Sequence, residues 1–135
     1  MKKPNLIAVI DDDASVRRAM KRLLRSVGMV AETFDSGLSF LALLESLPSF
    51  KPDCVVLDLQ MPGMTGLEVQ RRLAGSKLPV IFITAHDESA VRERALAAGA
   101  IAFLRKPFDD QLFIYTLREG LKSSMPREDS IAWPF

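Results

Sequence analysis

The feature that most constrains the fold is an alternation, repeated five times, between a short apolar run and an amphipathic segment. The apolar runs lie at 6–10, 29–34, 54–58, 79–84 and 100–104. They have the length of strands and are mostly continuous, as expected where both faces of a strand are covered. Strands that alternate with helices predict a mainly parallel sheet with helices on both faces. Because crossovers are right-handed, we expect a doubly wound α/β fold of five strands and five helices.

Local signals predict the faces and ends of the helices. Apolar residues recur at helical spacing from Val16 to Val27, and Gly28 follows where a left-handed cap is expected. In the second helix we expect Leu38, Leu41 and Leu44 to point inward. The remaining helices are predicted over 67–74, 88–97 and 109–122.

Composition is that of an ordinary globular domain. The chain has 135 residues, of which 48% are hydrophobic and 26% charged, enough for one compact domain with a continuous core. No apolar run approaches the roughly 20 residues of a membrane span, and the run after Asn5 is too short for a signal peptide. The single cysteine, Cys54, excludes an internal disulfide and suits the cytoplasm, where we expect it to be a small buried strand residue.

Charge carries little information about partners. The net charge of +1 argues neither for nor against nucleic acid binding. A local cluster of basic residues lies on the first predicted helix, at Arg17, Arg18, Lys21, Arg22 and Arg25. Its spacing places it opposite the apolar side, which predicts a solvated face.

We expect a single domain over residues 1–122 and a C-terminal tail or linker stub over 123–135. The tail is polar at first and ends in the apolar segment Ile131–Phe135. Either this segment packs onto the domain, or it belongs to a linker or contacts a partner.

Polar side chains that can react or bind ligands follow four of the predicted strands. Asp11, Asp12, Asp58, Thr84 and Lys106 stand at or just beyond strand ends. In a doubly wound sheet, function gathers beyond the carboxyl ends of the strands. Acids, a hydroxyl and an ammonium group are therefore predicted to meet at one edge.

Such a cluster needs a cation. Neighbouring carboxylates raise each other's pKa unless positive charge compensates, and Lys106 supplies only one charge. Mg²⁺ suits a site of few carboxylates, waters and a phosphate. A carboxylate nucleophile beside Mg²⁺ is an arrangement for forming an acyl phosphate, with Lys106 and Thr84 near the transferred oxygens.

Two residues near the cluster have simpler interpretations. Asp13 immediately precedes the first helix and is read as its N-cap. His86 is read as a surface loop residue, since the chain has no second histidine with which to share a metal.

Four collinear blocks resemble the signature blocks of response regulator receiver domains. They are Ile10-Asp11-Asp12, residues 56–66 (VLDLQMPGMTG), Ile83-Thr84-Ala85 and residues 104–108 (LRKPF). The resemblance covers about residues 5 to 122 and implies a flavodoxin-like sheet of strand order 2-1-3-4-5.

The resemblance also implies roles for individual residues. Asp58 matches the phosphoacceptor, Asp12 the direct metal ligand, Asp11 a ligand through water, and Gln60 the residue whose backbone carbonyl completes the site. The expected metal is Mg²⁺, with Mn²⁺ as a substitute.

Four further residues match the switching part of the family pattern. Thr84 matches the hydroxyl that moves to the phosphoryl group, and Lys106 its ammonium partner. Lys106-Pro107 resembles the family's cis-peptide turn. Phe103 occupies the position of an aromatic switch residue that is often Tyr.

The implied function is a signalling module and not an enzyme, apart from its own phosphorylation and dephosphorylation. A histidine kinase would phosphorylate Asp58 and change the surface of the fourth helix, fifth strand and fifth helix. The apolar residues of the last helix, at 112–115 and 117, wrap more than half of it, so we expect some exposed and available for a homodimer or an output contact. We expect no membrane contact and no direct nucleic acid contact, although a missing output domain would bind DNA.

Two other functional classes fit the sequence less well. A Mg²⁺-dependent phosphatase resembling haloacid dehalogenases would have an acid two residues after the nucleophile, where this chain has Gln60. Direct DNA binding by the arginines of the first helix lacks any recognition motif.

Overall fold

The computed structural model describes residues 3–86 and 88–123, and the segment Ile131–Phe135 lies outside them. Five strands form one sheet: β1 (Leu6–Ile10), β2 (Val30–Phe34), β3 (Cys54–Asp58), β4 (Val80–Thr84) and β5 (Ala102–Arg105). Five helices follow them in turn: α1 (Ala14–Ser26), α2 (Gly37–Ser46), α3 (Gly66–Arg72), α4 (Ser89–Ala97) and α5 (Asp110–Ser123). The predicted alternation is therefore confirmed, with boundaries shifted by one or two residues in most elements.

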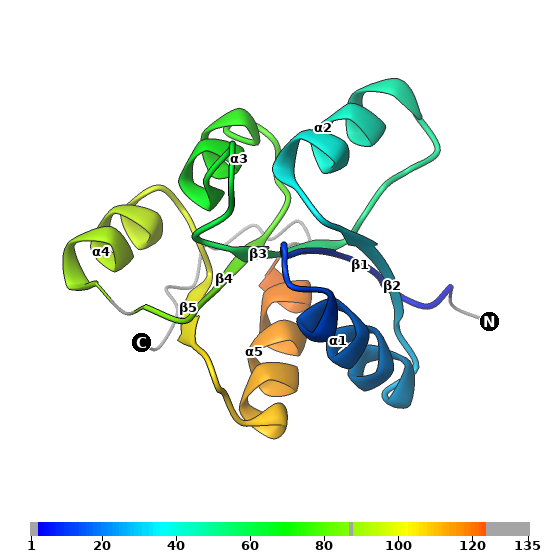
Figure 1. Ribbon diagram of the computed structural model, residues 1–135. Coiled ribbons are helices and arrows are strands. Elements are labelled where there is room, and N and C mark those ends of the chain that lie inside the picture. Colours follow the sequence, from blue (N-terminus) through cyan, green and yellow to red (C-terminus); the bar gives the residue numbers. More distant parts are fainter. Residues whose placement is uncertain (1–2, 87, 124–135) are drawn as a thin grey trace.

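All strand pairs are parallel, and the order across the sheet is β2-β1-β3-β4-β5. Helices α1 and α5 cover one face and α2, α3 and α4 the other, as Figure 1 shows. Each face has its own core, because alternate residues of a strand point to opposite sides. Phe40, Val55 and Phe82 belong to one core, and Leu24, Val56 and Phe113 to the other. The doubly wound, flavodoxin-like prediction is confirmed.

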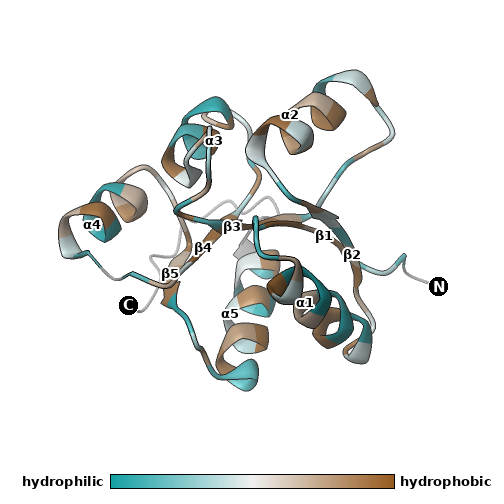
Figure 2. Ribbon diagram, viewed as in Figure 1, coloured by the Kyte–Doolittle hydropathy of each residue, from teal (hydrophilic) through white to brown (hydrophobic). Residues whose placement is uncertain are grey.

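The central strands are apolar on both faces, as the sequence predicted. All residues of β3 and β4 are buried, and Figure 2 shows these strands in the hydrophobic colour. Cys54 is fully buried at the start of β3, and burial raises the pKa of its thiol to about 12. Cys54 is thus a core residue, as expected.

The ends of α1 match their sequence signals. Asp13 is the N-cap, and its side chain accepts a hydrogen bond from the backbone N–H of Ser15. Gly28 lies beyond the helix with φ of +80°, a conformation that L side chains rarely adopt. Both predictions for this helix are confirmed.

The predicted inward face of α2 was partly wrong. Leu41 is buried and Leu44 is partly buried, but Leu38 is 61% exposed, and Phe40 occupies the core instead. Apolar residues lie all around α2, so their spacing does not select one face. The aromatic cluster of Phe34, Phe40 and Phe50 determines the orientation, since the Phe34 and Phe40 rings meet edge to face at 5.4 Å.

Helix α5 leaves apolar side chains on the surface. Phe113, Ile114 and Leu117 are buried, whereas Leu112 and Tyr115 are 48% and 53% exposed. This confirms the prediction that the helix is too apolar for one buried face. Across residues 3–86 and 88–123, every helix is too short or too polar to traverse a lipid bilayer.

Candidate functional site

The carboxyl ends of four parallel strands bring the predicted residues to one edge of the sheet. Asp58 is the last residue of β3, paired with Ile83, and Thr84 is the last residue of β4, paired with Arg105. Asp11 directly follows β1, and Lys106 directly follows β5. The parallel topology thus collects residues that are up to 95 positions apart in the sequence.

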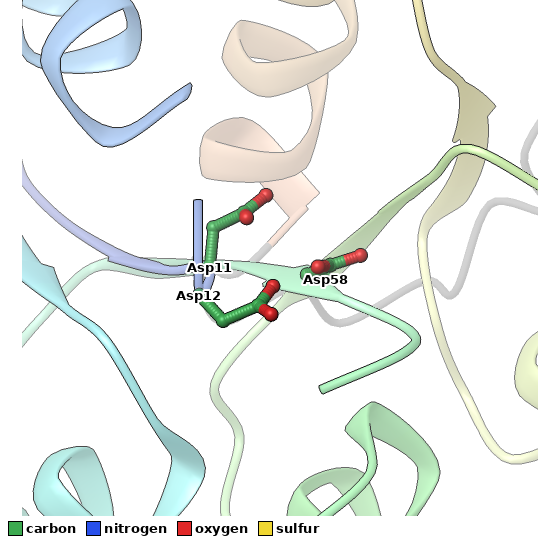
Figure 3. A group of neighbouring side chains, drawn as sticks. All are labelled: Asp11, Asp12 and Asp58. Carbon is green, nitrogen blue, oxygen red and sulfur yellow. The ribbon is translucent and has the colours of Figure 1, made fainter. Parts of the chain in front are cut away.

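Three carboxylates form the centre of this edge. Each of Asp11, Asp12 and Asp58 offers one oxygen, and these oxygens lie within 4.8 Å of one another. Figure 3 shows Asp11 and Asp12 on the segment after β1, beside Asp58 at the end of the neighbouring β3. Asp11 and Asp58 are buried, whereas Asp12 is exposed, so solvent reaches the group from the side of Asp12.

Lys106 supplies the positive charge that contacts this group. Its Nζ lies 2.7 Å from Asp11 Oδ2 and 3.6 Å from Asp58 Oδ1. The peptide bond between Lys106 and Pro107 is cis, as the family resemblance implied. The backbone N–H of Lys106 donates to the carbonyl of Thr84, which ties the start of this loop to β4.

Asp11 is held at both of its carboxylate oxygens. Oδ2 pairs with Lys106, and Oδ1 accepts a hydrogen bond of 2.9 Å from the backbone N–H of Asp13. Its side chain is fully buried. Because both oxygens of Asp11 already have a partner, whereas Asp12 is exposed, Asp12 is better placed than Asp11 to coordinate an ion directly.

Burial raises the pKa of Asp58 to about 7, with the negative charges of Asp11 and Asp12 adding to the effect and Lys106 opposing it. The carboxylates therefore outweigh the one ammonium group in contact with them. A hard divalent cation with oxygen ligands would restore the balance, and such a donor set fits Mg²⁺.

The hydroxyl of Thr84 is bonded to its own loop. Oγ1 donates to the carbonyl of His86 at 3.0 Å and accepts from the backbone N–H of His86 at 3.1 Å. Within residues 3–86 and 88–123, no hydrogen bond joins Thr84 to Asp58. His86 is exposed, in line with its interpretation as a surface loop residue.

Phe103 and Gln60 lie close to the site in the fold. Phe103 is partly buried in β5, and its ring centroid lies 5.9 Å from that of Phe82 on the neighbouring strand. Gln60 lies in the loop after β3, two residues beyond Asp58, with an exposed side chain.

Sequence reasoning missed two residues that shape this edge. Arg17, predicted to be solvated, is partly buried and donates from Nη1 to the backbone carbonyl of Asp11 at 2.7 Å. A Cβ added at Gly66 would lie 2.5 Å from the carbonyl oxygen of Asp58, so only glycine lets α3 begin this close to β3. An arginine in the first turn of the helix after the acids was the signal available for Arg17.

Comparisons with known proteins agree with this geometry. A family model described as "Response regulator receiver domain" matches residues 7–118. The crystal structure of a response regulator receiver protein from Burkholderia phymatum is 59% identical at a TM-score of 0.81, covering 98% of this chain and all of that one. Full-length FixJ from B. japonicum is 35% identical at a TM-score of 0.82, covering 93% of this chain and 61% of that one.

The curated relatives are longer than this chain. The response regulator protein TmoT of Ectopseudomonas mendocina is 36% identical over 128 residues, which are 93% of this chain and 57% of that protein. The chain spans about half the length of the curated relatives it matches.

Proposed function

The chain belongs to the response regulator receiver domain family of two-component systems, and from that premise we propose that Asp58 accepts a phosphoryl group from a histidine kinase. The observation that carries the proposal is the meeting of Asp11, Asp12 and Asp58 with Lys106 at one sheet edge. We propose residues 1–122 as the receiver domain, acting in the cytoplasm.

Asp58 is the proposed nucleophile. Its carboxylate oxygen forms a bond to phosphorus while the bond from phosphorus to the donor's imidazole nitrogen breaks, and that nitrogen keeps the electron pair. Mg²⁺, or Mn²⁺ in its place, would be held by Asp12, Asp58 and the backbone carbonyl of Gln60, with Asp11 acting through water. When bound, the ion neutralises charge on the phosphoryl oxygens.

Lys106 and Thr84 recognise the product. Lys106 already lies 3.6 Å from Asp58, so a phosphoryl oxygen on Asp58 gains an ammonium partner. The hydroxyl of Thr84 exchanges its bond to the carbonyl of His86 for a bond to the phosphoryl group. Dephosphorylation is attack by water on the same phosphorus, which returns Asp58 to its carboxylate.

The proposed output is a change of the surface formed by α4, β5 and α5. Movement of Thr84 makes room for Phe103, whose contact with Phe82 is then rearranged. Only a difference in phosphoryl contacts between the two states drives such a shift. The exposed apolar residue Leu112 lies on α5 and suits a homodimer or a contact with an output domain, whereas Tyr115 faces a groove between α1 and α5.

DNA is proposed as an indirect partner. The FixJ relative is described as a transcriptional regulatory protein, and this chain spans 61% of it. A DNA contact of the present protein would be made through an output domain and not through the receiver.

Phosphorylation is tested with Mg²⁺ and a small-molecule phosphodonor. We expect a base-labile, acid-stable adduct of one phosphoryl group, found by intact mass and mapped to Asp58. Asp58→Asn is expected to form none. Asp35→Asn, a change at an exposed aspartate on the loop after β2, is the matched control and is expected to keep the full yield.

Each outcome of this experiment decides the proposal. Absence of the adduct in the native protein, or an equal yield in Asp58→Asn, would overturn it. An adduct formed equally well after removal of divalent metal would overturn the metal's role alone.

A further inference from the structure

Arg17 contacts the acidic edge from the first turn of α1. Its backbone N–H donates to the carbonyl of Asp13, as in any helix, whereas its guanidinium turns back along the chain. Nη1 donates to the backbone carbonyl of Asp11 at 2.7 Å, six residues earlier, and the bond is partly buried. The guanidinium thus bonds the peptide group that joins Asp11 to Asp12.

The other polar atoms of Asp11 already have partners. Its backbone N–H donates to the carbonyl of Phe34 at 3.1 Å, and its carboxylate accepts from Asp13 and Lys106. With the Arg17 bond, Asp11 is fixed at both backbone atoms and at both carboxylate oxygens. A buried carbonyl without a partner is unfavourable, so the Arg17 bond has a structural reason of its own.

Asp12 depends on this anchoring more than Asp11 does. It is exposed, and the carboxylates of Asp11 and Asp58 that lie near it repel it when ionised. The peptide plane before Asp12 therefore sets the direction in which its side chain leaves the backbone, and a side-chain contact with Asp58 acts on its carboxyl end. We propose that Arg17 is a positioning residue, which orients that plane so that the Asp12 carboxylate faces the proposed Mg²⁺ site; the inference rests on the proposed function.

Charge and positioning predict opposite effects of removing Arg17. The positive charge of Arg17 repels a divalent cation. If charge were its only effect, removing Arg17 would tighten Mg²⁺ binding, most clearly at low salt. Loss of positioning would weaken binding at any salt concentration. Outer partners that orient metal ligands typically affect affinity by about 10- to 100-fold.

The test is a calorimetric titration of Mg²⁺ into four proteins at low and moderate salt. For Arg17→Ala we expect about 10-fold weaker binding than for the native protein. Arg17→Lys, which keeps the charge and one donor group, is expected to recover part of the loss. Arg18→Ala removes a neighbouring exposed arginine and is expected to stay within about 2-fold, because it changes charge without touching the loop.

Unchanged or tighter binding in Arg17→Ala would overturn the inference, and so would an equal loss in Arg18→Ala. If Arg17→Ala does not fold, Arg17→Lys carries the test, and native affinity in that variant together with an unmoved Asp12 amide resonance would overturn the role of the guanidinium bond to Asp11. If the native protein binds no Mg²⁺, the proposed function fails separately. The amide resonances of Asp12 and Asp13 in the metal-free protein then decide on Arg17, since unmoved resonances in Arg17→Ala would overturn it.

Discussion

Helices α1 and α4 each follow a strand that ends in site residues, yet they are attached to the molecule differently. Helix α1 buries Met20 and Leu24 against the sheet, and Asp13 caps its N-terminus. Among the nine residues of α4, all of them described, only Ala95 is buried, and Glu88 at its N-cap makes no side-chain capping bond. Figure 1 shows α4 at the end of its layer, beside β5, whereas α1 lies against β1 and β2.

This difference suits the two helices to different roles. Local opening is easiest where few apolar side chains are buried, so α4 should open at lower free energy than α1. The three carboxylates repel one another and need a firm support, which α1 and its loop provide for Asp11 and the peptide group that follows it. A switching surface needs an element that moves more easily, and α4 is part of the surface proposed to change.

Core truncation is the largest expected effect. Leu24→Ala removes a fully buried side chain from the core under α1 and should lower the free energy of unfolding by about 3 to 5 kcal/mol. Val91→Ala, at a partly buried position on α4, should cost only about 0.5 to 1 kcal/mol. Urea denaturation followed by circular dichroism measures both, and equal losses would break the comparison.

The raised pKa of Asp58 makes the stability of the metal-free protein depend on pH. In metal-free protein, the folded-state pKa of Asp58 is about 7, above its ordinary value of 3.8, so folding favours the protonated form. This contribution to stability is complete below about pH 4 and is lost as pH rises to about 7, because the native state binds the proton more tightly. Asp58→Asn removes the titration.

We therefore compare native protein and Asp58→Asn in a chelating buffer from pH 4 to pH 8. The variant should gain about 1 to 3 kcal/mol over the native protein across this range, with most of the gain below pH 7. Asp35→Asn, which changes an exposed carboxyl, should show no such trend. A difference that is constant with pH would contradict the raised pKa.

The fold was largely predictable from sequence because strands β1, β3 and β4 are buried on both faces. Continuous apolar runs that end in charged or hydroxylated residues predict both where these strands lie and which residues stand at their carboxyl ends. The acidic edge followed from the same pattern, since parallel strands must deliver Asp11, Asp58 and Lys106 to one side.

What sequence did not predict depends on side-chain direction. The spacing of Leu38, Leu41 and Leu44 predicts that all three point inward, but α2 is apolar on every side, and the aromatic neighbours of Phe40 favour a different rotation. The spacing of Arg17 predicts a solvated face, yet its guanidinium is partly buried against the backbone carbonyl of Asp11. No sequence signal marks Gln70, although its Nε2 donates to the carbonyl of Ala95, 25 residues later. Such long-range polar contacts have no periodicity to reveal them.

The Gln70 bond offers a sharper test of how α4 is attached. Gln70 is buried on α3, and its bond of 2.9 Å reaches the one buried residue of α4. Gln70→Ala should cost about 1 to 2 kcal/mol and leave a buried carbonyl with one fewer donor. Hydrogen exchange should accelerate in α4 and stay unchanged in α1. Gln111→Ala, at an exposed position on α5, is the control and should alter hydrogen exchange in neither helix. Faster hydrogen exchange throughout the protein after Gln70→Ala would mean that the bond supports the whole fold.

The smallest effects concern the two helix N-termini, and their signs are informative. Asp13→Ala should destabilise the protein, because the backbone N–H of Ser15 loses its acceptor. Glu88→Ser should instead stabilise it by about 0.5 to 1 kcal/mol, since α4 lacks a side-chain cap and serine is a good N-cap residue. Thermal unfolding measures both, and hydrogen exchange locates the gain. Added stability in α4 is then compared with the proposed change in the surface of α4, β5 and α5 after phosphorylation. If Glu88→Ser slows that change, the low stability of α4 is part of the switch. If the change is unaffected, the missing cap of α4 has no role in it.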